Sequence, residues 1–198
     1  MRIITGRAKG LRLKTPAGLL TRPTSDRVKE SLFSILSGLI NFSEIKSVLD
    51  IFAGTGALGL ESISRGASSA TFIDNATAEI IRENISKSKF ENCKVLRGDF
   101  EKILRRLAEQ NFLFDLIFSD PPYAKGLAQK SLNLIAEKNL ISTGGLMVIE
   151  HGAEEILDVP TNLNLVRKII YGHTTAITII ERKASLWRRL FVREVSTQ

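Results

Sequence analysis

The stretch Val48–Gly59 constrains the fold of this chain more than any other. An apolar run that includes Asp50 leads directly into a loop holding Gly54, Gly56 and Gly59, and a helical pattern of apolar residues follows. This order predicts a buried strand, a tight turn and the N-terminus of a helix. Because glycine has no Cβ and tolerates positive φ, the backbone of such a turn can approach a ligand closely. The stretch therefore predicts one side of a ligand site.

The chain after this stretch alternates strand and helix patterns. Strands are expected at 47–52, 70–74, 93–97, 114–119 and 146–150, and helices at 57–66, 76–89, 100–107 and 127–139. The Gly144-Gly145 pair is interpreted as the turn before the last of these strands. Segments 165–171 and 175–181, joined by a short turn, predict an antiparallel pair at the end of the sheet. The pattern predicts an α/β fold with a mostly parallel sheet, an antiparallel end and helices on both faces.

Two further elements are expected ahead of this alternation. Arg2–Gly6 and Leu11–Lys14 have the pattern of a short β-hairpin, with apolar and basic residues alternating in the second arm. Thr24 or Ser25 can then cap a helix, whose apolar residues recur every three or four positions as far as Leu39. The chain therefore predicts a small hairpin extension before the α/β core.

Positive charge is concentrated at the two ends of the chain. The net charge is +7; residues 1–30 carry +6 and residues 182–198 carry +4, so the residues between them carry −3. A slightly acidic body with two basic ends is typical of a protein that holds a polyanion, most often nucleic acid; a pair of solubilising tails is the alternative. We divide the chain into a basic N-terminal segment at 1–24, an α/β domain at 25–182 and a basic tail at 183–198.

Composition excludes several classes of protein. The single cysteine, Cys93, allows no internal disulfide and is expected to be a packed thiol. No metal-ligand cluster is visible, and His151 is expected to make a structural hydrogen bond. Trp187, in the tail, is expected to pack on the body, with stacking on a base as the alternative. No apolar run approaches the roughly 20 residues that span a bilayer, and no signal peptide is visible, so we expect a cytoplasmic protein.

Three acids at the ends of successive predicted strands narrow the choice of ligand: Asp50 lies inside the first strand end, Asp74 ends the second and Asp99 follows the third. The glycine loop matches the dinucleotide pattern G-x-G-x-x-G, which is weak alone. Asp50 argues against a pyrophosphate and favours an ammonium group such as that of S-adenosylmethionine. Asp74 can accept both ribose hydroxyls of either cofactor, and Asp99 can accept an adenine amine beside the ring of Phe100, or cap the next helix. The candidate cofactor-binding residues are Asp50, Phe52, Gly54, Gly56, Asp74, Asp99 and Phe100.

The fourth predicted strand delivers Asp120-Pro121-Pro122-Tyr123 to the carboxyl edge of the sheet. An exocyclic amine of a nucleobase is a poor nucleophile because its lone pair is delocalised into the ring. The Asp120 carboxylate and the Pro121 carbonyl can accept its N–H bonds and localise that lone pair toward a methyl donor. Pro122 stiffens the loop, and Tyr123 can stack on the base. We therefore expect a methyltransferase, with Asp120, Pro121 and Tyr123 as the catalytic candidates.

These motifs resemble those of the RsmD family of 16S rRNA (guanine-N2)-methyltransferases. The likeness covers roughly residues 1–182, and its most specific segments are Arg22–Glu30 and Asp120–Gly126. It continues through Glu150-His151 and Tyr171-Gly172. The resemblance implies a Rossmann-like methyltransferase sheet and S-adenosylmethionine as cofactor, with S-adenosylhomocysteine as product and no metal. It implies a guanine of 16S rRNA as substrate, presented in a small ribosomal subunit or an assembly intermediate.

The basic residues of the first thirty positions are expected to grip RNA phosphates. The candidate substrate-binding residues are Arg2, Arg7, Lys9, Arg12, Arg22, Arg27 and Pro122. We expect a monomer. Three alternatives stay open: a DNA adenine-N6 methyltransferase, which can use the same Asp-Pro-Pro-Tyr tetrapeptide; a nicotinamide oxidoreductase; and a non-catalytic RNA-binding assembly factor.

Overall fold

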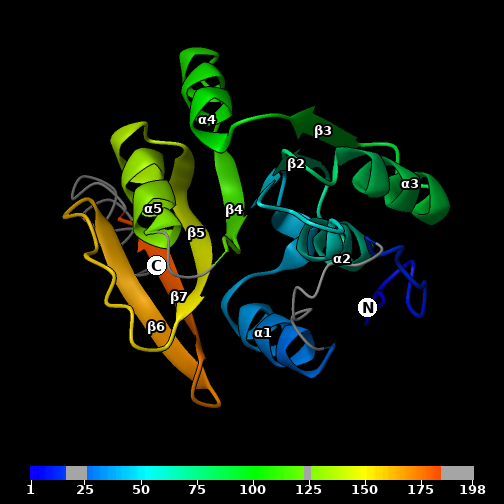
Figure 1. Ribbon diagram of the computed structural model, residues 1–198, viewed down its shortest axis with the longest axis horizontal. Coiled ribbons are helices and arrows are strands. Elements are labelled where there is room, and N and C mark those ends of the chain that lie inside the picture. Colours follow the sequence, from blue (N-terminus) through cyan, green and yellow to red (C-terminus); the bar gives the residue numbers. More distant parts are fainter. Residues whose placement is uncertain (17–25, 123–125, 184–198) are drawn as a thin grey trace, which may run out of the picture.

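The computed structural model describes residues 1–16, 26–122 and 126–183, and Figure 1 shows the arrangement of their helices and strands. The helices are α1 (Asp26–Leu39), η1 (Phe42–Glu44), α2 (Ala57–Arg65), α3 (Ala78–Ser88), α4 (Phe100–Glu109) and α5 (Leu127–Glu137). The strands are β1 (Val48–Ile51), β2 (Ala70–Asp74), β3 (Cys93–Arg97), β4 (Phe114–Ser119), β5 (Ile141–Gly152), β6 (Leu163–Tyr171) and β7 (Thr175–Arg182). The bounds of β2, β3 and β4 are those that the sequence predicts.

The described strands form one seven-stranded sheet in the order β3-β2-β1-β4-β5-β7-β6. The five strands from β3 to β5 pair in parallel, whereas β7 pairs antiparallel with both β5 and β6. This confirms the predicted mostly parallel sheet with an antiparallel end. Within the described ranges, no helix is long and apolar enough to cross a membrane.

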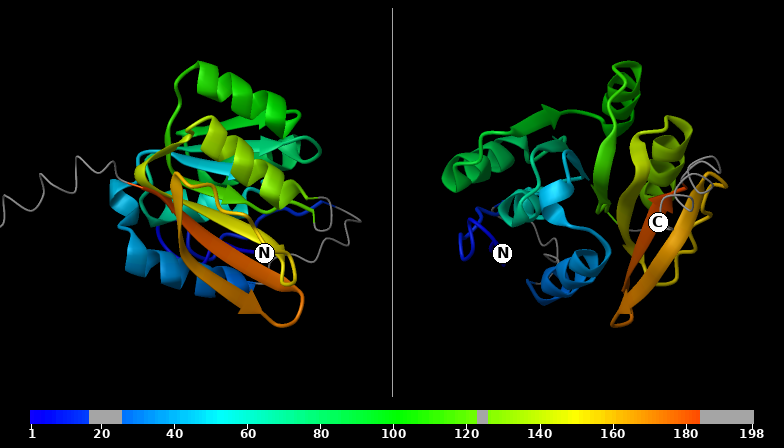
Figure 2. Two further views of the ribbon diagram at one scale, coloured as in Figure 1. Left: turned by 90° about the vertical axis from the view of Figure 1, so that its left-hand side faces the viewer. Right: turned by 180° about the vertical axis from the view of Figure 1, so that it is seen from behind.

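Helices cover both faces of the sheet, as Figures 1 and 2 show. Successive strand residues point to opposite faces, so each strand contributes to two cores. Val48 and Phe118 pack in one core with apolar residues of α1, α2 and α3, and their neighbours Leu49 and Ile117 pack in the other with α4 and α5. All four side chains are fully buried, which explains why these strands are continuous apolar runs.

The predicted turn at Gly144-Gly145 is wrong, because both glycines lie inside β5. Ile141 pairs with Phe114, and the next pairing joins Leu146 to Leu116, so the register shifts across this stretch. Gly144 has a φ of +76°, which a residue without a Cβ adopts readily. The strand is therefore irregular between Ile141 and Leu146, and it pairs with β4 before and after this stretch.

The predicted N-terminal hairpin does not form regular strands. Its arms pair antiparallel at one bridge, between Arg2 and Arg12, and three backbone hydrogen bonds of 2.9 to 3.2 Å join them: Ile3 N–H to the Leu11 carbonyl, Gly10 N–H to the Ile3 carbonyl and Leu13 N–H to the Met1 carbonyl. The backbone N–H groups of Ile4 and Thr5 instead donate to the carboxylate of Glu61 in α2, at 2.7 and 3.0 Å. A helix side chain 56 and 57 residues away thus anchors the first arm to α2, a contact that local sequence pattern does not reveal.

Candidate active site

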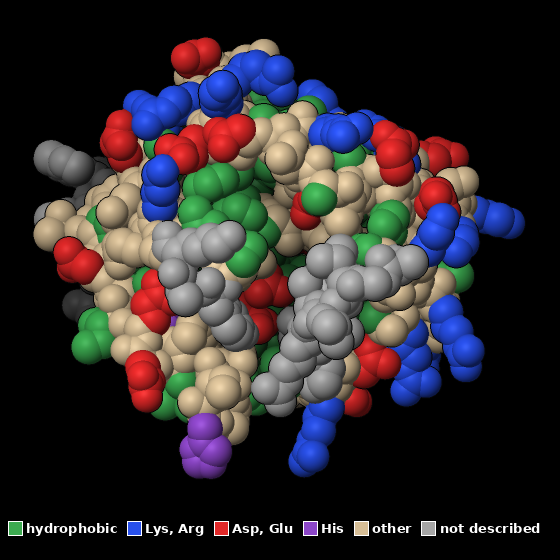
Figure 3. Space-filling view, viewed as in Figure 1, with side chains coloured by type: hydrophobic (Ala, Val, Ile, Leu, Met, Phe, Trp, Pro, Cys, Tyr) green, Lys and Arg blue, Asp and Glu red, His purple; other side chains and the backbone are tan. Residues whose placement is uncertain are grey.

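A cavity of about 1190 Å³ opens at the carboxyl ends of the parallel strands. The loops after β1, β2, β3 and β4 line it, together with residues of β5, of the β6–β7 turn, of α1 and of the N-terminal segment. Figure 3 looks onto this face, where acidic and hydrophobic side chains gather at the centre and basic ones lie mainly toward the edge. Among the described candidates, the cavity is lined by Asp50, Phe52, Gly54, Asp74, Asp99, Phe100, Asp120, Pro121 and Pro122.

Asp50 lies at the base of this cavity, beside the N-terminus of α2. Its side chain is 2% exposed, and its Oδ2 accepts the backbone N–H of Gly59 at 2.9 Å. A Cβ on Gly59 would lie 2.4 Å from the ring of Phe72, so glycine allows the helix to come this close. Burial raises the pKa of Asp50 well above its ordinary value of 3.8, and the charges of Asp120 and Asp74 raise the pKa further, against the opposing Gly59 hydrogen bond.

Asp74 fastens the glycine loop to the turn after β2. One carboxylate oxygen accepts the N–H of Gly54 at 2.9 Å, and the other accepts those of Ala76 and Thr77 at 2.8 Å each. A carboxylate offers about four acceptor positions, so these three bonds leave capacity for a ligand. The sequence predicted Asp74 as a ligand acceptor but not its role in holding two loops together.

Two aromatic rings form an apolar wall of the cavity. Phe52 and Phe100 have ring centroids 4.7 Å apart, at an interplanar angle of 53°. Phe52 has a φ of +59°, an unusual conformation for a bulky residue and one found at functional sites. Asp99 begins α4 and accepts the N–H of Lys102 at 3.1 Å, which confirms the predicted helix cap, and it also lines the cavity.

Thr77 is a cavity residue that the sequence analysis missed. It is the N-cap residue of α3, yet its side chain makes no capping bond. It is 7% exposed, and its Oγ1 is the only buried side-chain polar atom in the described part of the chain without a hydrogen-bond partner. A threonine before a helix predicts a cap, so the sequence pattern does not indicate an unpartnered hydroxyl in a residue of the cavity lining.

The ends of β4 and β5 form the opposite side of the cavity. The Asp120 N–H donates to the Ile51 carbonyl at 3.4 Å, which ties the Asp120–Pro122 loop to the end of β1. Tyr123 lies outside the described residues. Glu150 and Tyr171 also line the cavity. Both belong to motifs that carried the family resemblance, but the sequence analysis gave them no role.

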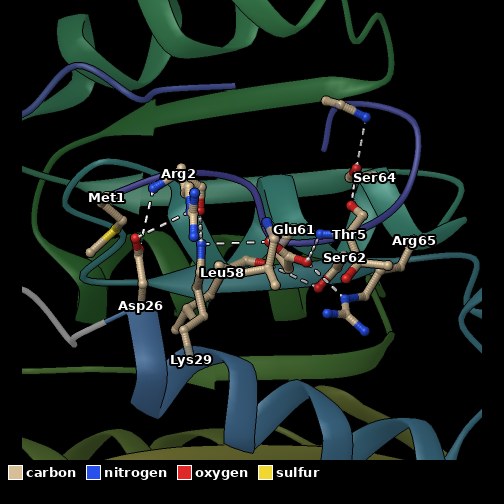
Figure 4. A network of polar contacts seen from close by, with 12 residues as sticks. Met1, Arg2, Thr5, Asp26, Lys29, Leu58, Glu61, Ser62, Ser64 and Arg65 are labelled. Atoms are coloured by element: carbon tan, nitrogen blue, oxygen red, sulfur yellow. Dashed lines mark hydrogen bonds and ion pairs between the residues drawn. The ribbon is translucent and has the colours of Figure 1, made fainter. Parts of the chain in front are cut away.

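The N-terminal segment forms a further wall, since Met1, Thr15 and Pro16 line the cavity. A buried polar network holds this segment, as Figure 4 shows. Lys29 of α1 contacts the Arg2 carbonyl and lies 3.5 Å from Glu61, and both charged side chains are almost fully buried.

Lys29 is thus an exception to the expectation that the basic residues of the first thirty positions grip phosphates. Its side chain faces Glu61, and burial lowers its pKa against the opposing effect of that carboxylate.

Several other basic candidates lie on the surface. Arg2, Arg7, Lys9, Arg12 and Arg27 are all exposed, and none lines the cavity. Arg2 pairs with Asp26 at 3.7 Å, and the Arg7 guanidinium lies 5.4 Å from the centroid of the Phe90 ring. The structure does not bring these five side chains into the site. Arg22, the cap candidates Thr24 and Ser25, and Trp187 lie outside the described residues.

The surroundings of His151 and Cys93 are those of residues with a structural role. His151 Nε2 lies 2.8 Å from Thr178 Oγ1 and Nδ1 lies 2.9 Å from the Gly152 carbonyl, which confirms a structural hydrogen bond. Burial raises the pKa of Cys93 to about 11, so its thiol stays protonated at neutral pH. Over the described ranges, no group of three or more His, Cys, Asp or Glu residues could hold a metal ion.

Comparison with known proteins identifies the family. The family model described as conserved hypothetical protein 95 matches residues 1–180. Ribosomal RNA small subunit methyltransferase D of Escherichia coli is 34% identical over 93% of this chain and 91% of that protein. YlbH of Bacillus subtilis is 35% identical over 92% of this chain and 100% of that protein. The solved structure of yhhF from Escherichia coli has a TM-score of 0.81 and 34% identity, covering 93% of this chain and 99% of that chain. The chain belongs to the RsmD family.

Proposed function

We propose that this protein transfers a methyl group from S-adenosylmethionine to the exocyclic N2 of a guanine in 16S rRNA of the small ribosomal subunit. The observation that carries the proposal is an acidic cavity that joins Asp50, Asp74 and Asp99 to the Asp120-Pro121 loop. The 34% identity to ribosomal RNA small subunit methyltransferase D supports the same activity.

The charge of the cavity favours S-adenosylmethionine over a nicotinamide dinucleotide. The acidic residues that line it are Asp50, Asp74, Asp99, Glu101, Asp120 and Glu150. Among its described lining residues, Lys29 is the only one with a basic side chain, and Glu61 lies beside it. Such a cavity attracts a sulfonium and an ammonium group and repels a pyrophosphate.

The described residues fit the parts of S-adenosylmethionine. Asp50 suits the ammonium group, Asp74 the ribose hydroxyls and Asp99 the adenine amine, with Phe52 and Phe100 beside the adenine ring. The unpartnered hydroxyl of Thr77 fits a polar ligand, because a buried hydroxyl without a hydrogen bond is unfavourable. When bound, the cofactor supplies the electrophilic methyl group.

In the proposed reaction, the protein acts by positioning and polarisation. The Asp120 carboxylate and the Pro121 carbonyl accept the two N–H bonds of the guanine amine. As the N–C bond formed, the bond between the methyl carbon and the sulfonium sulfur would break and leave S-adenosylhomocysteine, and Asp120 could take the proton that N2 loses. The base first leaves its stack, which costs a few kcal/mol. Tyr123 stacks on it in this proposal.

The exposed basic residues of the N-terminal segment supply affinity for the substrate in this proposal. Lys9 and Arg12 are exposed, as is Arg27 in the adjoining first turn of α1, and contacts of such residues with phosphates are independent of base sequence. The site then determines which base is methylated, and the subunit or assembly intermediate presents that guanine to it.

The product nucleoside tests the proposal. Labelled S-adenosylmethionine is supplied with undermethylated small subunits, free 16S rRNA or duplex DNA, and the product is digested and mapped. We expect N2-methylguanosine at one position of the rRNA. Asp120→Asn should lose transfer and keep S-adenosylhomocysteine binding. N6-methyladenosine would overturn the proposal, as would transfer at the wild-type rate by the Asn variant.

A further inference from the structure

Glu150 lies beside Asp120 at the same edge of the sheet. Ser119 of β4 pairs with Ile149 of β5, and Asp120 and Glu150 are the next residue of each segment. Both acids line the cavity, and Glu150 is half-buried. The site therefore presents two neighbouring carboxylates where the proposed chemistry needs acceptors for only one amine.

The face of the sheet to which Glu150 belongs is the one that α1 covers. Val148, two residues earlier in the strand, packs in the core that contains Leu32 and Phe33 of α1. Because strand side chains alternate, Glu150 shares that face. Val28 and Lys29 of α1 line the same cavity. In the strand order β3-β2-β1-β4-β5, β1 and β4 lie between Glu150 and the acids Asp74 and Asp99, which line the part assigned to the cofactor.

The Watson–Crick edge of guanine explains a second carboxylate. Guanine carries two adjacent donors on this edge, N1–H and the N2 amine, whereas adenine carries an amine beside an N1 acceptor. A carboxylate can accept N1–H of guanine but opposes the lone pair of adenine N1. Enzymes that act on an extruded base identify it by hydrogen bonds to this edge.

We propose that the Glu150 carboxylate accepts N1–H of the target guanine and thereby selects guanine over adenine, while Asp120 and Pro121 hold the N2 amine. This inference rests on the proposed function. It assigns Glu150 a role in substrate choice that is separate from the polarisation of the amine. Loss of a specific polar contact of this kind typically lowers discrimination roughly 10- to 100-fold.

The test uses a base analogue that separates the two contacts. 2-Aminopurine keeps the amine at the guanine N2 position but has an acceptor in place of N1–H. Small subunits are rebuilt with guanine or 2-aminopurine at the mapped target position, and kcat/KM for methyl transfer is measured for each. Wild type should prefer guanine roughly 10- to 100-fold or more. In Glu150→Gln the side-chain amide can either accept from guanine or donate to 2-aminopurine, so the ratio should fall close to one.

A control variant and a measurement of cofactor affinity accompany this test. Glu154→Gln, an exposed acid outside the cavity lining, should keep the wild-type ratio, and S-adenosylhomocysteine affinity should be the same in all three proteins. A wild-type ratio in Glu150→Gln would overturn the assignment of Glu150. An equal loss on both bases would also overturn it, since that pattern indicates a structural role. If wild type methylates no guanine N2, the proposed function fails instead.

Discussion

Asp50 places a carboxylate where burial and the charges of Asp120 and Asp74 all oppose ionisation. Its raised pKa means that the folded protein binds a proton more tightly than the unfolded chain does. The free energy of unfolding of the ligand-free protein therefore falls as pH rises from the ordinary value of 3.8 toward the raised pKa. A cationic group of the cofactor would offset this charge.

Asp50→Asn should accordingly stabilise the ligand-free protein and weaken cofactor binding. The amide oxygen can still accept the Gly59 N–H, so the fold is kept. Melting temperatures should be higher than those of wild type at pH 8, with the difference shrinking as pH falls, and S-adenosylmethionine affinity should drop about tenfold or more. Thermal melts at several pH values and calorimetric titration check both effects. A variant that is less stable than wild type at every pH would contradict the account.

Thr77→Val removes the unpartnered hydroxyl and keeps the shape of the side chain. Burial of a hydroxyl without a hydrogen bond is unfavourable, so the ligand-free protein should gain about 1 kcal/mol in the free energy of unfolding. S-adenosylhomocysteine affinity should fall roughly five- to tenfold if the hydroxyl binds the cofactor. Urea unfolding and calorimetry measure the two quantities, and Thr77→Ser serves as the control that keeps the hydroxyl. Unchanged affinity in the Val variant would remove Thr77 from the cofactor site.

Helix α2 and the N-terminal segment depend on one another through Glu61. This buried carboxylate accepts the N–H groups of Ile4 and Thr5 and pairs with Lys29 and Arg65. Removing one partner of a buried ion pair leaves an uncompensated charge, a larger loss than any single hydrogen bond.

Glu61→Gln should lower the free energy of unfolding by about 3–5 kcal/mol. Glu83 provides the comparison, because it also pairs with a lysine, Lys14 at 2.7 Å, but both side chains are about half exposed. Glu83→Gln should cost less than about 1 kcal/mol. Urea denaturation of the two variants measures the loss in the free energy of unfolding for each. Similar losses in both would show that the buried network does not hold the segment.

Some elements follow from local sequence, and others do not. The strands β2, β3 and β4 could be predicted because each is an apolar run between turn residues. A strand buried between two helix layers requires such a run. The arms of the predicted hairpin pair antiparallel but do not form regular strands. The contacts of Glu61 with the first arm and with Lys29 could not be predicted, because these partners lie far apart in sequence. Asp50, Asp74 and Asp99 could be predicted to lie together because parallel strands bring their carboxyl ends to one edge, and all three line the cavity; their ligand contacts stay predictions. The positions of Thr77 and Glu150 in the cavity lining were not predicted, because a threonine before a helix and an acid in a strand have ordinary explanations.

At the scale of the whole molecule, charge is separated between an acidic cavity and exposed basic residues around it. Association with rRNA should therefore depend steeply on salt, whereas binding of the small cofactor should depend on it weakly.

Lys9→Glu combined with Arg12→Glu should weaken association with the small subunit. Both side chains are exposed and neither lines the cavity, so cofactor affinity should stay at the wild-type value. The slope of log K against log salt should become shallower by roughly one per lost phosphate contact. Binding measured across a salt series checks this, and an unchanged slope would place the RNA on another surface.

The wall of the cavity made by residues 1–16 has a consequence for how the protein opens. Its polar anchors reach partners 56 to 70 residues further along the chain, and Ile3 and Leu13 pack it against the core. It adds no strand to the sheet, so we expect it to detach before the sheet unfolds. In hydrogen exchange, the amides of Ile4 and Thr5 report detachment of this wall, and those of β1 and β4 report global unfolding. Without cofactor the first set should exchange faster than the second. Added cofactor should slow both sets, because it binds neither the detached nor the unfolded state. We therefore expect the rim of the site to open at a lower free energy than the sheet.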